Sequence, residues 1–281
     1  AELFRARLAE RKGDFARAEQ LYHDAIRAQS RAVTRYYDFL GEQYGAEQIE
    51  RFVAFSDVLA PVIESLPTDV VQAVGARLSV IVEQHDSRVV TWLDHAIGRG
   101  SLDAMVSKVE YLIRWEKDFG PAETFALIDQ IAPLSPQHAD NLRANAYLVR
   151  LWTTFNPEAA YKILTAQLES GRIEAHLGLG RLYTIGGLDE VDQVSALSHY
   201  ATAARQGLSI ALYRMATIHE GGRAICRDKH KALALAQLAK AYGQSAADPM
   251  VERLTAEMDE ESLRRVKALR EAMARELGLG V

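Results

Sequence analysis

The sequence is poor in several residue types, and each shortage excludes a class of protein. It contains one cysteine, Cys226, which excludes a disulfide within the chain and a zinc site built from several cysteines. Seven prolines exclude a collagen-like or proline-rich chain. No run approaches the ~18 consecutive apolar residues of a membrane-spanning helix. Acidic residues outnumber basic ones, 38 to 33, which argues against a broad nucleic-acid-binding surface.

What is present is an ordinary globular composition. The 281 residues are 48% hydrophobic and 25% charged, which is more apolar material than a disordered chain carries. The length allows one or two domains. The first ten residues, AELFRARLAE, predict an amphipathic helix and not a signal peptide, and no methionine precedes them. We therefore interpret the sequence as a fragment or a mature form, before which a targeting or lipidation signal could have stood.

An internal repeat is the strongest pattern in the sequence. Small and capping residues recur every 36 positions in the second half, in the series Ala160–Ala196–Ala232, Gly171–Gly207–Gly243, Ala175–Ala211–Ala247, Gly186–Gly222 and Asp192–Asp228. Intervals of 36 and then 35 residues before Gly171 lead to further small residues that can end a helix, namely Ser135, Gly100, Ser65 and Ser30. The first half is therefore predicted to be the same repeat in diverged form.

Each repeat predicts two antiparallel helices. Residues 172–185 place apolar side chains on one face at helical spacing, and the pair Gly186-Gly187 ends this first helix. Asp192 is placed to cap a second helix over residues 193–206. Recurrent alanines and glycines let helix backbones approach closely. Stacked pairs then bury the apolar faces that a single pair leaves open.

Two β-branched stretches compete with this interpretation. Residues 78–82 (LSVIV) and 89–93 (VVTWL) have the composition of strands. The repeat places both stretches inside helices, and tertiary context often overrides local propensity. We therefore expect helices at both places.

The C-terminal repeats resemble Sel1-like repeats, which are relatives of tetratricopeptide (TPR) repeats. The matching residues of one unit are Ala175, Leu179-Gly180, Tyr183, Gly186, Asp192, Ala196, Tyr200, Ala203-Ala204 and Gly207. The next unit has Met215-Ala216 and His219 where the pattern has a Leu-Gly pair and a tyrosine, but it keeps Asp228 and Gly243. Residues 13–26 resemble the second half of a TPR unit.

These patterns together predict the fold. We expect an all-α right-handed α-solenoid of about seven TPR/Sel1-like helix pairs plus a C-terminal closing helix. We expect a single domain over residues 1–281, with diverged TPR-like repeats in 1–156, Sel1-like repeats in 157–258 and the closing helix in 259–281. Asp259 stands where it would cap the closing helix.

A narrower resemblance is to the AlgK family of outer-membrane lipoprotein scaffolds in alginate secretion. It lies in the segments 126–133 (ALIDQIAP), 179–183 (LGRLY) and 232–239 (ALALAQLA). The resemblance implies a periplasmic, outer-membrane-associated adaptor, held by a lipid anchor that this chain lacks. It also implies two protein partners, the polysaccharide acetyltransferase AlgX and an outer-membrane export porin.

The sequence offers no convincing catalytic or cofactor motif. Gly178 and Gly180 begin a Gly-x-Gly pattern, but Tyr183 replaces the third glycine and no strand precedes them, so we interpret them as helix-packing glycines. Cys226 and His230 are four residues apart, yet a zinc site needs at least three ligands. We therefore predict no catalytic residue, no metal site, no cofactor and no enzymatic activity. Cys226 is interpreted as a loop residue before a helix that begins near Lys229.

Aromatic and basic residues remain as candidates for contact with partners. Most tryptophans in such helices fill the core, and we expect this of Trp92, Trp115 and Trp152. Residues His199 and His219 fall at or beside repeat positions and are interpreted as packing residues. Three side chains lie on predicted first helices, off the packing stripe, where such solenoids present a concave wall: Arg181, Tyr213 and Arg214. We predict that they bind a partner, although an ordinary solvated surface explains each of them equally well.

The function predicted from the sequence is that of a non-catalytic scaffold for protein–protein interaction. Our leading hypothesis is a periplasmic protein that organises the modification and export of an alginate-like exopolysaccharide at the outer membrane. A second hypothesis is a generic Sel1-type adaptor in signalling or membrane-protein assembly. A third is a solenoid enzyme that acts on polysaccharide, which would require a carboxylate or histidine cluster on the concave face.

Overall fold

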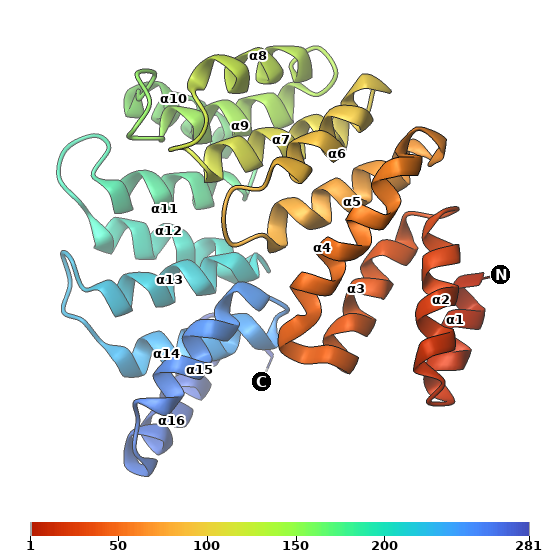
Figure 1. Ribbon diagram of the computed structural model, residues 1–281. Helices are drawn as coiled ribbons and strands as arrows, with labels where there is room; N and C mark the ends of the chain where they lie inside the picture. Colours follow the sequence, from red (N-terminus) through yellow and green to blue (C-terminus); the bar gives the residue numbers. More distant parts are fainter. Residues whose placement is uncertain (1, 281) are drawn as a thin grey trace. The chain divides into compact units, whose positions relative to one another are not determined.

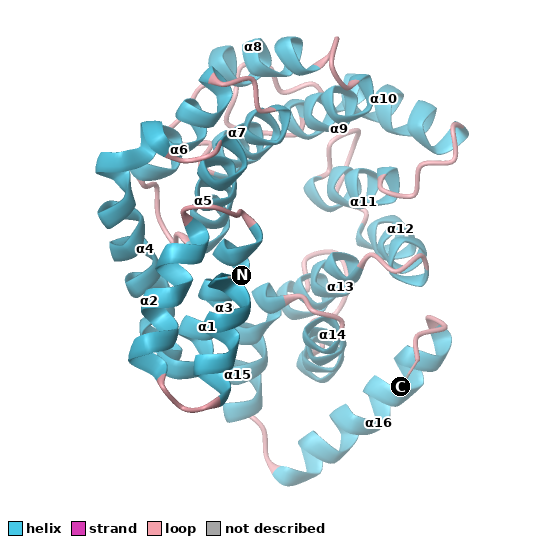
Figure 2. Ribbon diagram, turned by 90° about the vertical axis from the view of Figure 1, so that its right-hand side faces the viewer, coloured by secondary structure: helices cyan, strands magenta, loops and turns pink. Residues whose placement is uncertain are grey.

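The computed structural model of the chain describes residues 2–280 and is all-α over that range. Figure 2 shows helices joined by loops, with no strand among these residues. The first β-branched stretch ends α5 (Thr68–Ile81), and the second lies within α6 (Ser87–Gly98). The prediction of helices at both places is therefore confirmed.

The internal contacts divide the chain into two compact units, Ala1–Leu142 and Arg143–Val281. The division falls inside α9 (Pro136–Tyr147). The other helices of the first unit are α1 (Glu2–Arg11), α2 (Phe15–Ile26), α3 (Arg31–Tyr44), α4 (Gln48–Leu59), α5, α6, α7 (Leu102–Arg114) and α8 (Pro121–Ile131), with the short 3-10 helices η1 (Gly45–Glu47) and η2 (Ala60–Ser65). The predicted single domain and its inner boundaries stay a prediction.

The second unit continues the same plan. Its helices after α9 are α10 (Pro157–Glu169), α11 (Ala175–Ile185), α12 (Gln193–Arg205), α13 (Ser209–Gly221), α14 (Lys229–Ala241), α15 (Asp248–Ala256) and α16 (Glu260–Glu276), with the 3-10 helix η3 (Ser245–Ala247). Figure 1 shows α11 to α14 side by side, and each packs against the next along the chain. The predicted all-α fold of repeated helix pairs is therefore confirmed.

Helix ends fall where the repeat places them. The turns after α10 and α12 contain Gly171 and Gly207 with φ angles of 81° and 91°, which a residue with a side chain rarely adopts. The Asp192 side chain caps α12 by accepting hydrogen bonds from the backbone N–H groups of Val194 and Ser195. The period observed in the sequence thus has a local cause, because a turn glycine ends one helix and a capping aspartate begins another at the same place in successive repeats.

The C-terminal end consists of a short helix within the predicted repeat range 157–258 and the predicted closing helix. The closing helix is α16, and Asp259 caps it through the N–H of Ser262, as predicted. The short helix is α15, which follows η3. Both α15 and α16 pack against α14. Gly278, 35 residues after Gly243, ends α16 with another positive φ of 67°. The repeat period therefore continues to the end of the described chain.

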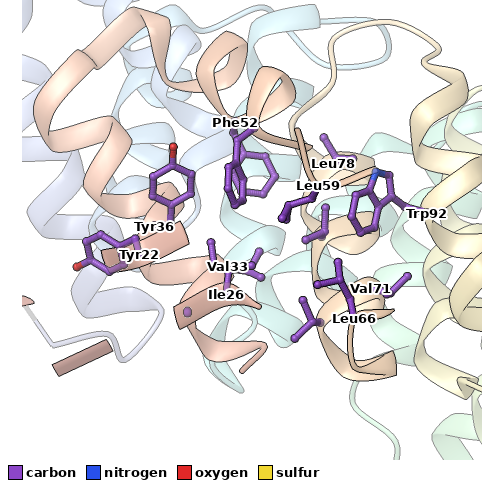
Figure 3. Packing of buried hydrophobic residues seen from close by; sticks show 14 of the residues in the cluster. Tyr22, Ile26, Val33, Tyr36, Phe52, Leu59, Leu66, Val71, Leu78 and Trp92 are labelled. Carbon is purple, nitrogen blue, oxygen red and sulfur yellow. The ribbon is translucent and has the colours of Figure 1, made fainter. Parts of the chain in front are cut away.

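The core of the first unit is rich in aromatic side chains. Figure 3 shows part of it, from Tyr22 on α2 to Trp92 on α6, with Tyr36 and Phe52 between them. All four side chains are almost fully buried. Burial of large rings supplies much of the hydrophobic free energy of such a unit. The prediction for the tryptophans is confirmed for Trp92 and Trp152, while Trp115 is only partly buried against the core.

The core of the second unit is built from smaller residues. In α14 seven of thirteen residues are buried: Ala232, Leu233, Ala234, Leu235, Ala236, Leu238 and Ala239. A helix buried on most sides must have neighbours on most sides, and α13, α15 and α16 all pack against it. Alanine allows these close approaches because its side chain adds little bulk between two backbones.

Arginine side chains join consecutive repeats in the first unit. Arg99 donates to the carbonyl oxygens of Leu66 and Ile63 at 2.7 and 2.9 Å. Arg114 donates to the carbonyl of Ser79 at 2.7 Å, 35 residues earlier. The last carbonyls of a helix have no partner within it, so a guanidinium from the next repeat satisfies them.

Candidate partner-binding surface

The three predicted contact residues lie on first helices of their pairs, as expected. Arg181 is on α11, and its Nη1 lies 3.5 Å from both the carbonyl oxygen and the Oδ1 of Asn145. Tyr213 and Arg214 are neighbours on α13, where Tyr213 packs partly into the core and Arg214 is exposed. Their role in binding a partner stays a prediction.

A buried tyrosine links the two arginines. The ring of Tyr200 on α12 lies against Gly180, where an added Cβ atom would stand 2.6–2.8 Å from three ring carbons. Burial raises the pKa of Tyr200, while the charges of Arg214 and Arg181 and a hydrogen bond with Thr184 oppose that rise. Both guanidinium groups therefore act on one buried hydroxyl. Arg181 and Arg214 are 33 positions apart in the sequence, yet the charge of each lowers the pKa of this tyrosine.

A histidine pair lies between α11 and α12. The Nδ1 atoms of His176 and His199 are 2.9 Å apart and the ring centroids 5.2 Å apart, so the two nitrogens point at each other. One Nδ1–H therefore donates to the other Nδ1. Burial lowers the pKa of both rings, and His176 lowers that of His199 further. Tyr183 stacks on His199 with centroids 5.5 Å apart.

A second polar network lies in the first unit. Tyr36 donates to Glu19 at 3.0 Å and lies 2.9 Å from the Nε2 of His23, which must therefore be the donor to the Tyr36 oxygen. Tyr44 donates to the other oxygen of Glu19 at 3.2 Å. This is the kind of cluster that the enzyme hypothesis requires. However, Tyr36 is only 1% exposed and both of its hydrogen-bonding roles are filled within the network.

The specific pairings in both networks were not predicted from the sequence. Glu19 and His23 are four residues apart and share a helix face, which was the available signal. The position of Tyr36 on the next helix had no local signal. The interpretation of His199 as a packing residue is confirmed by its stacking on Tyr183, but its bond to His176 was not foreseen.

The predicted loop position of Cys226 is confirmed. The residue is exposed and precedes α14, which begins at Lys229. Within the described part of the chain, no group of three or more histidine, cysteine, aspartate or glutamate side chains is arranged to hold a metal ion. Among the same residues, no helix is both long and apolar enough to cross a membrane.

Comparison with known proteins supports the resemblance inferred from the residues. No family model matches the chain. Over 144 residues it is 30% identical to the alginate biosynthesis protein AlgK of Azotobacter vinelandii. The chain resembles AlgK. The matched segment is 50% of this chain but only 30% of that AlgK protein, so less than a third of the relative is represented.

Solved structures of repeat proteins also match the chain. A protective antigen of uropathogenic Escherichia coli with an SLR fold matches 93% of this chain and 64% of its own, with a TM-score of 0.42 and 14% identity. A Sel1 repeat protein of Klebsiella pneumoniae matches 66% of this chain and 93% of its own, with a TM-score of 0.43 and 16% identity.

Proposed function

We propose that the chain is a non-catalytic scaffold that holds other proteins in the periplasm, in a complex that modifies and exports an alginate-like exopolysaccharide at the outer membrane. The observation that supports this most is the similarity to AlgK, an alginate biosynthesis protein, over half of the chain. Successive helix pairs suit the role because they present an extended series of side chains to a partner.

The proposed contact residues are Arg181, Tyr213 and Arg214. An exposed arginine and a neighbouring tyrosine are residue types that often anchor protein interfaces. The proposed partners are a polysaccharide-modifying enzyme such as AlgX and an outer-membrane export porin. Attachment to the membrane would come from a lipid anchor outside this sequence, and no cofactor takes part.

Capture from periplasmic extract tests the proposal. The purified chain, immobilised and crosslinked, should enrich a polysaccharide-modifying enzyme or an export porin, identified by mass spectrometry. Arg181→Gln/Arg214→Gln should weaken that enrichment. The matched control Arg205→Gln/Arg265→Gln removes the same charge from two exposed positions of the same unit and should not. Enrichment of neither class of partner would contradict the scaffold in exopolysaccharide export.

The adaptor hypothesis predicts a different location. A Sel1-type adaptor in signalling would fractionate with cytoplasmic proteins, whereas the proposed scaffold fractionates with the outer membrane. Cell fractionation of the gene product expressed from its own chromosomal locus separates the two.

A further inference from the structure

The loop between α11 and α12 borders a cavity of about 580 Å³. Its lining includes Tyr183 from the end of α11 and Val194 from the start of α12, with Ala224 from the following repeat. The volume lies within the range of about 300–1,000 Å³ that is usual for ligand sites. The side-chain Oε1 of Gln193 joins the two repeats here by accepting hydrogen bonds from the backbone N–H groups of Ala224 and Ile225.

The charge of this cavity is of one sign. Asp189, Glu190 and Asp192 line it, and no lysine or arginine of the described residues does. Asp192 is engaged as the cap of α12. Asp189 and Glu190 are exposed and have neither an ion pair nor a hydrogen bond from a described side chain. A similar cavity in the first unit contains its own Arg88, so the absence of an internal cation is particular to this one.

Apolar side chains border the same opening. Val194 is 70% exposed and Leu188 is 38% exposed. Tyr183 lines the same cavity, and its ring stacks on His199. Exposed apolar residues beside a cavity are typical of a surface that a partner covers.

We propose that this cavity receives an arginine side chain of a protein partner, presented between apolar residues of an extended segment. This rests on the proposed scaffold function and names the chemistry of one contact. The guanidinium would pair with the carboxylates of Asp189 and Glu190, which have no cation of their own. It would lie against the Tyr183 ring, and the flanking apolar residues would cover Leu188 and Val194.

Model peptides test the charge requirement directly. The probes are N-acetyl-Leu-Arg-Leu-amide and the same peptide with citrulline, a neutral isostere, in place of arginine. We expect the arginine peptide to shift the methyl NMR signals of Leu188 and Val194, and to bind more weakly as salt is raised. Asp189→Asn/Glu190→Gln should weaken its affinity about three- to tenfold, because each partly exposed ion pair contributes modestly.

A matched variant controls for total charge. Glu169→Gln/Glu174→Gln removes two exposed carboxylates of the same unit outside the cavity and should leave the affinity unchanged. Equal shifts from the arginine and citrulline peptides, or equal effects of the two double variants, would overturn the inference. The scaffold proposal would survive that result, since it depends on capture from periplasmic extract. Conversely, if the arginine peptide binds but periplasmic extract yields no export partner, the arginine site is supported and the proposed scaffold function is contradicted.

Discussion

Single residues set how closely the helices of the second unit approach. Gly180 allows the Tyr200 ring to lie on the backbone of α11, and the interpretation of this glycine as a packing residue is confirmed. A ring held between two helices moves less easily than the end of a flexible side chain. The close approach therefore depends on the missing Cβ atom.

Gly180→Ala should destabilise the second unit. Overpacking costs about 1–3 kcal/mol, while alanine gains about 1 kcal/mol of helix propensity, so a net loss of about 1 kcal/mol is expected in urea denaturation. Gly221→Ala is the control, because nothing lies within 4 Å of its added Cβ atom. It should stabilise by about 0.4–1 kcal/mol. Equal effects of the two changes would contradict the packing role.

The histidine pair predicts how stability depends on pH. The pKa of His176 and of His199 is lower in the folded protein than in the unfolded chain, chiefly through burial. At a pH between the folded-state and the unfolded-state pKa, the unfolded chain therefore binds more protons than the folded protein. The free energy of unfolding consequently falls as the pH drops below about 6.5. His23 and His219 shift in the same direction.

His176→Gln/His199→Gln should therefore reduce the loss of stability between pH 7.5 and pH 5, without abolishing it. Thermal denaturation at a series of pH values measures the slope. His138→Gln, at an exposed position in the first unit, serves as the matched histidine replacement. An unchanged slope in the double variant would show that the pair does not titrate as its burial requires.

At the scale of elements, helix caps differ although their residue types agree. Ser101 accepts a hydrogen bond from the N–H of Ala104 at the start of α7. Ser30 stands at the same position of α3 but makes no such bond. Ser30 belongs to the repeated helix boundaries and Ser101 directly follows one of them, Gly100, so the sequence alone does not distinguish the two caps.

Ser101→Ala should lower the free energy of unfolding by about 1 kcal/mol, the usual cost of a lost cap. Ser30→Ala should change it by less than about 0.5 kcal/mol, because no cap bond is lost. Chemical denaturation of the two variants compares the same substitution in the same unit. A larger effect at Ser30 would contradict the assignment of the caps.

A buried lysine joins three consecutive helices of the first unit. The Nζ of Lys108 on α7 lies 2.7 Å from Asp94 on α6 and 2.6 Å from Glu123 on α8, and its side chain is 7% exposed. Burial lowers the pKa of Lys108, but the bonds to both carboxylates outweigh burial and raise it overall. Its charge therefore persists at neutral pH.

Lys108→Met should cost about 1–2 kcal/mol, less than a fully buried pair, because both carboxylates are half exposed to water. Lys117→Met, at an exposed position nearby, should be close to neutral. Thermal denaturation compares the two. A stabilising effect of Lys108→Met would mean that the cost of burying the charge exceeds the benefit of its two ion pairs.

For the whole molecule, the contacts of each helix are mainly with its neighbours along the chain. The stability of such a series of repeats is close to a sum of terms from each repeat and its neighbours. A destabilising substitution should therefore lower the stability mainly of the helices around it. Leu78 on α5 and Leu235 on α14 are both fully buried, one in each compact unit. The same Leu→Ala substitution can therefore be made at an equally buried position in each unit.

Leu78→Ala should lower hydrogen-exchange protection in α3–α7, and Leu235→Ala in α12–α16, each by about 2–5 kcal/mol. Protection in the other unit should stay near its wild-type value. Hydrogen exchange with mass spectrometry measures both regions in one experiment. Equal loss of protection throughout the chain would contradict local coupling and indicate one cooperative unit.

The sequence by itself determined the fold class, the repeat period and several helix boundaries of the C-terminal repeats. It did so because turn glycines, capping aspartates and close-packing alanines act over a few residues and recur visibly in one dimension. It also placed Arg181 and Arg214 on first helices. Only the tertiary structure decided which polar groups meet, such as His176 with His199 and Tyr36 with Glu19. Those contacts depend on the rotation and crossing of neighbouring helices, which side chains from both helices set together and no local pattern specifies.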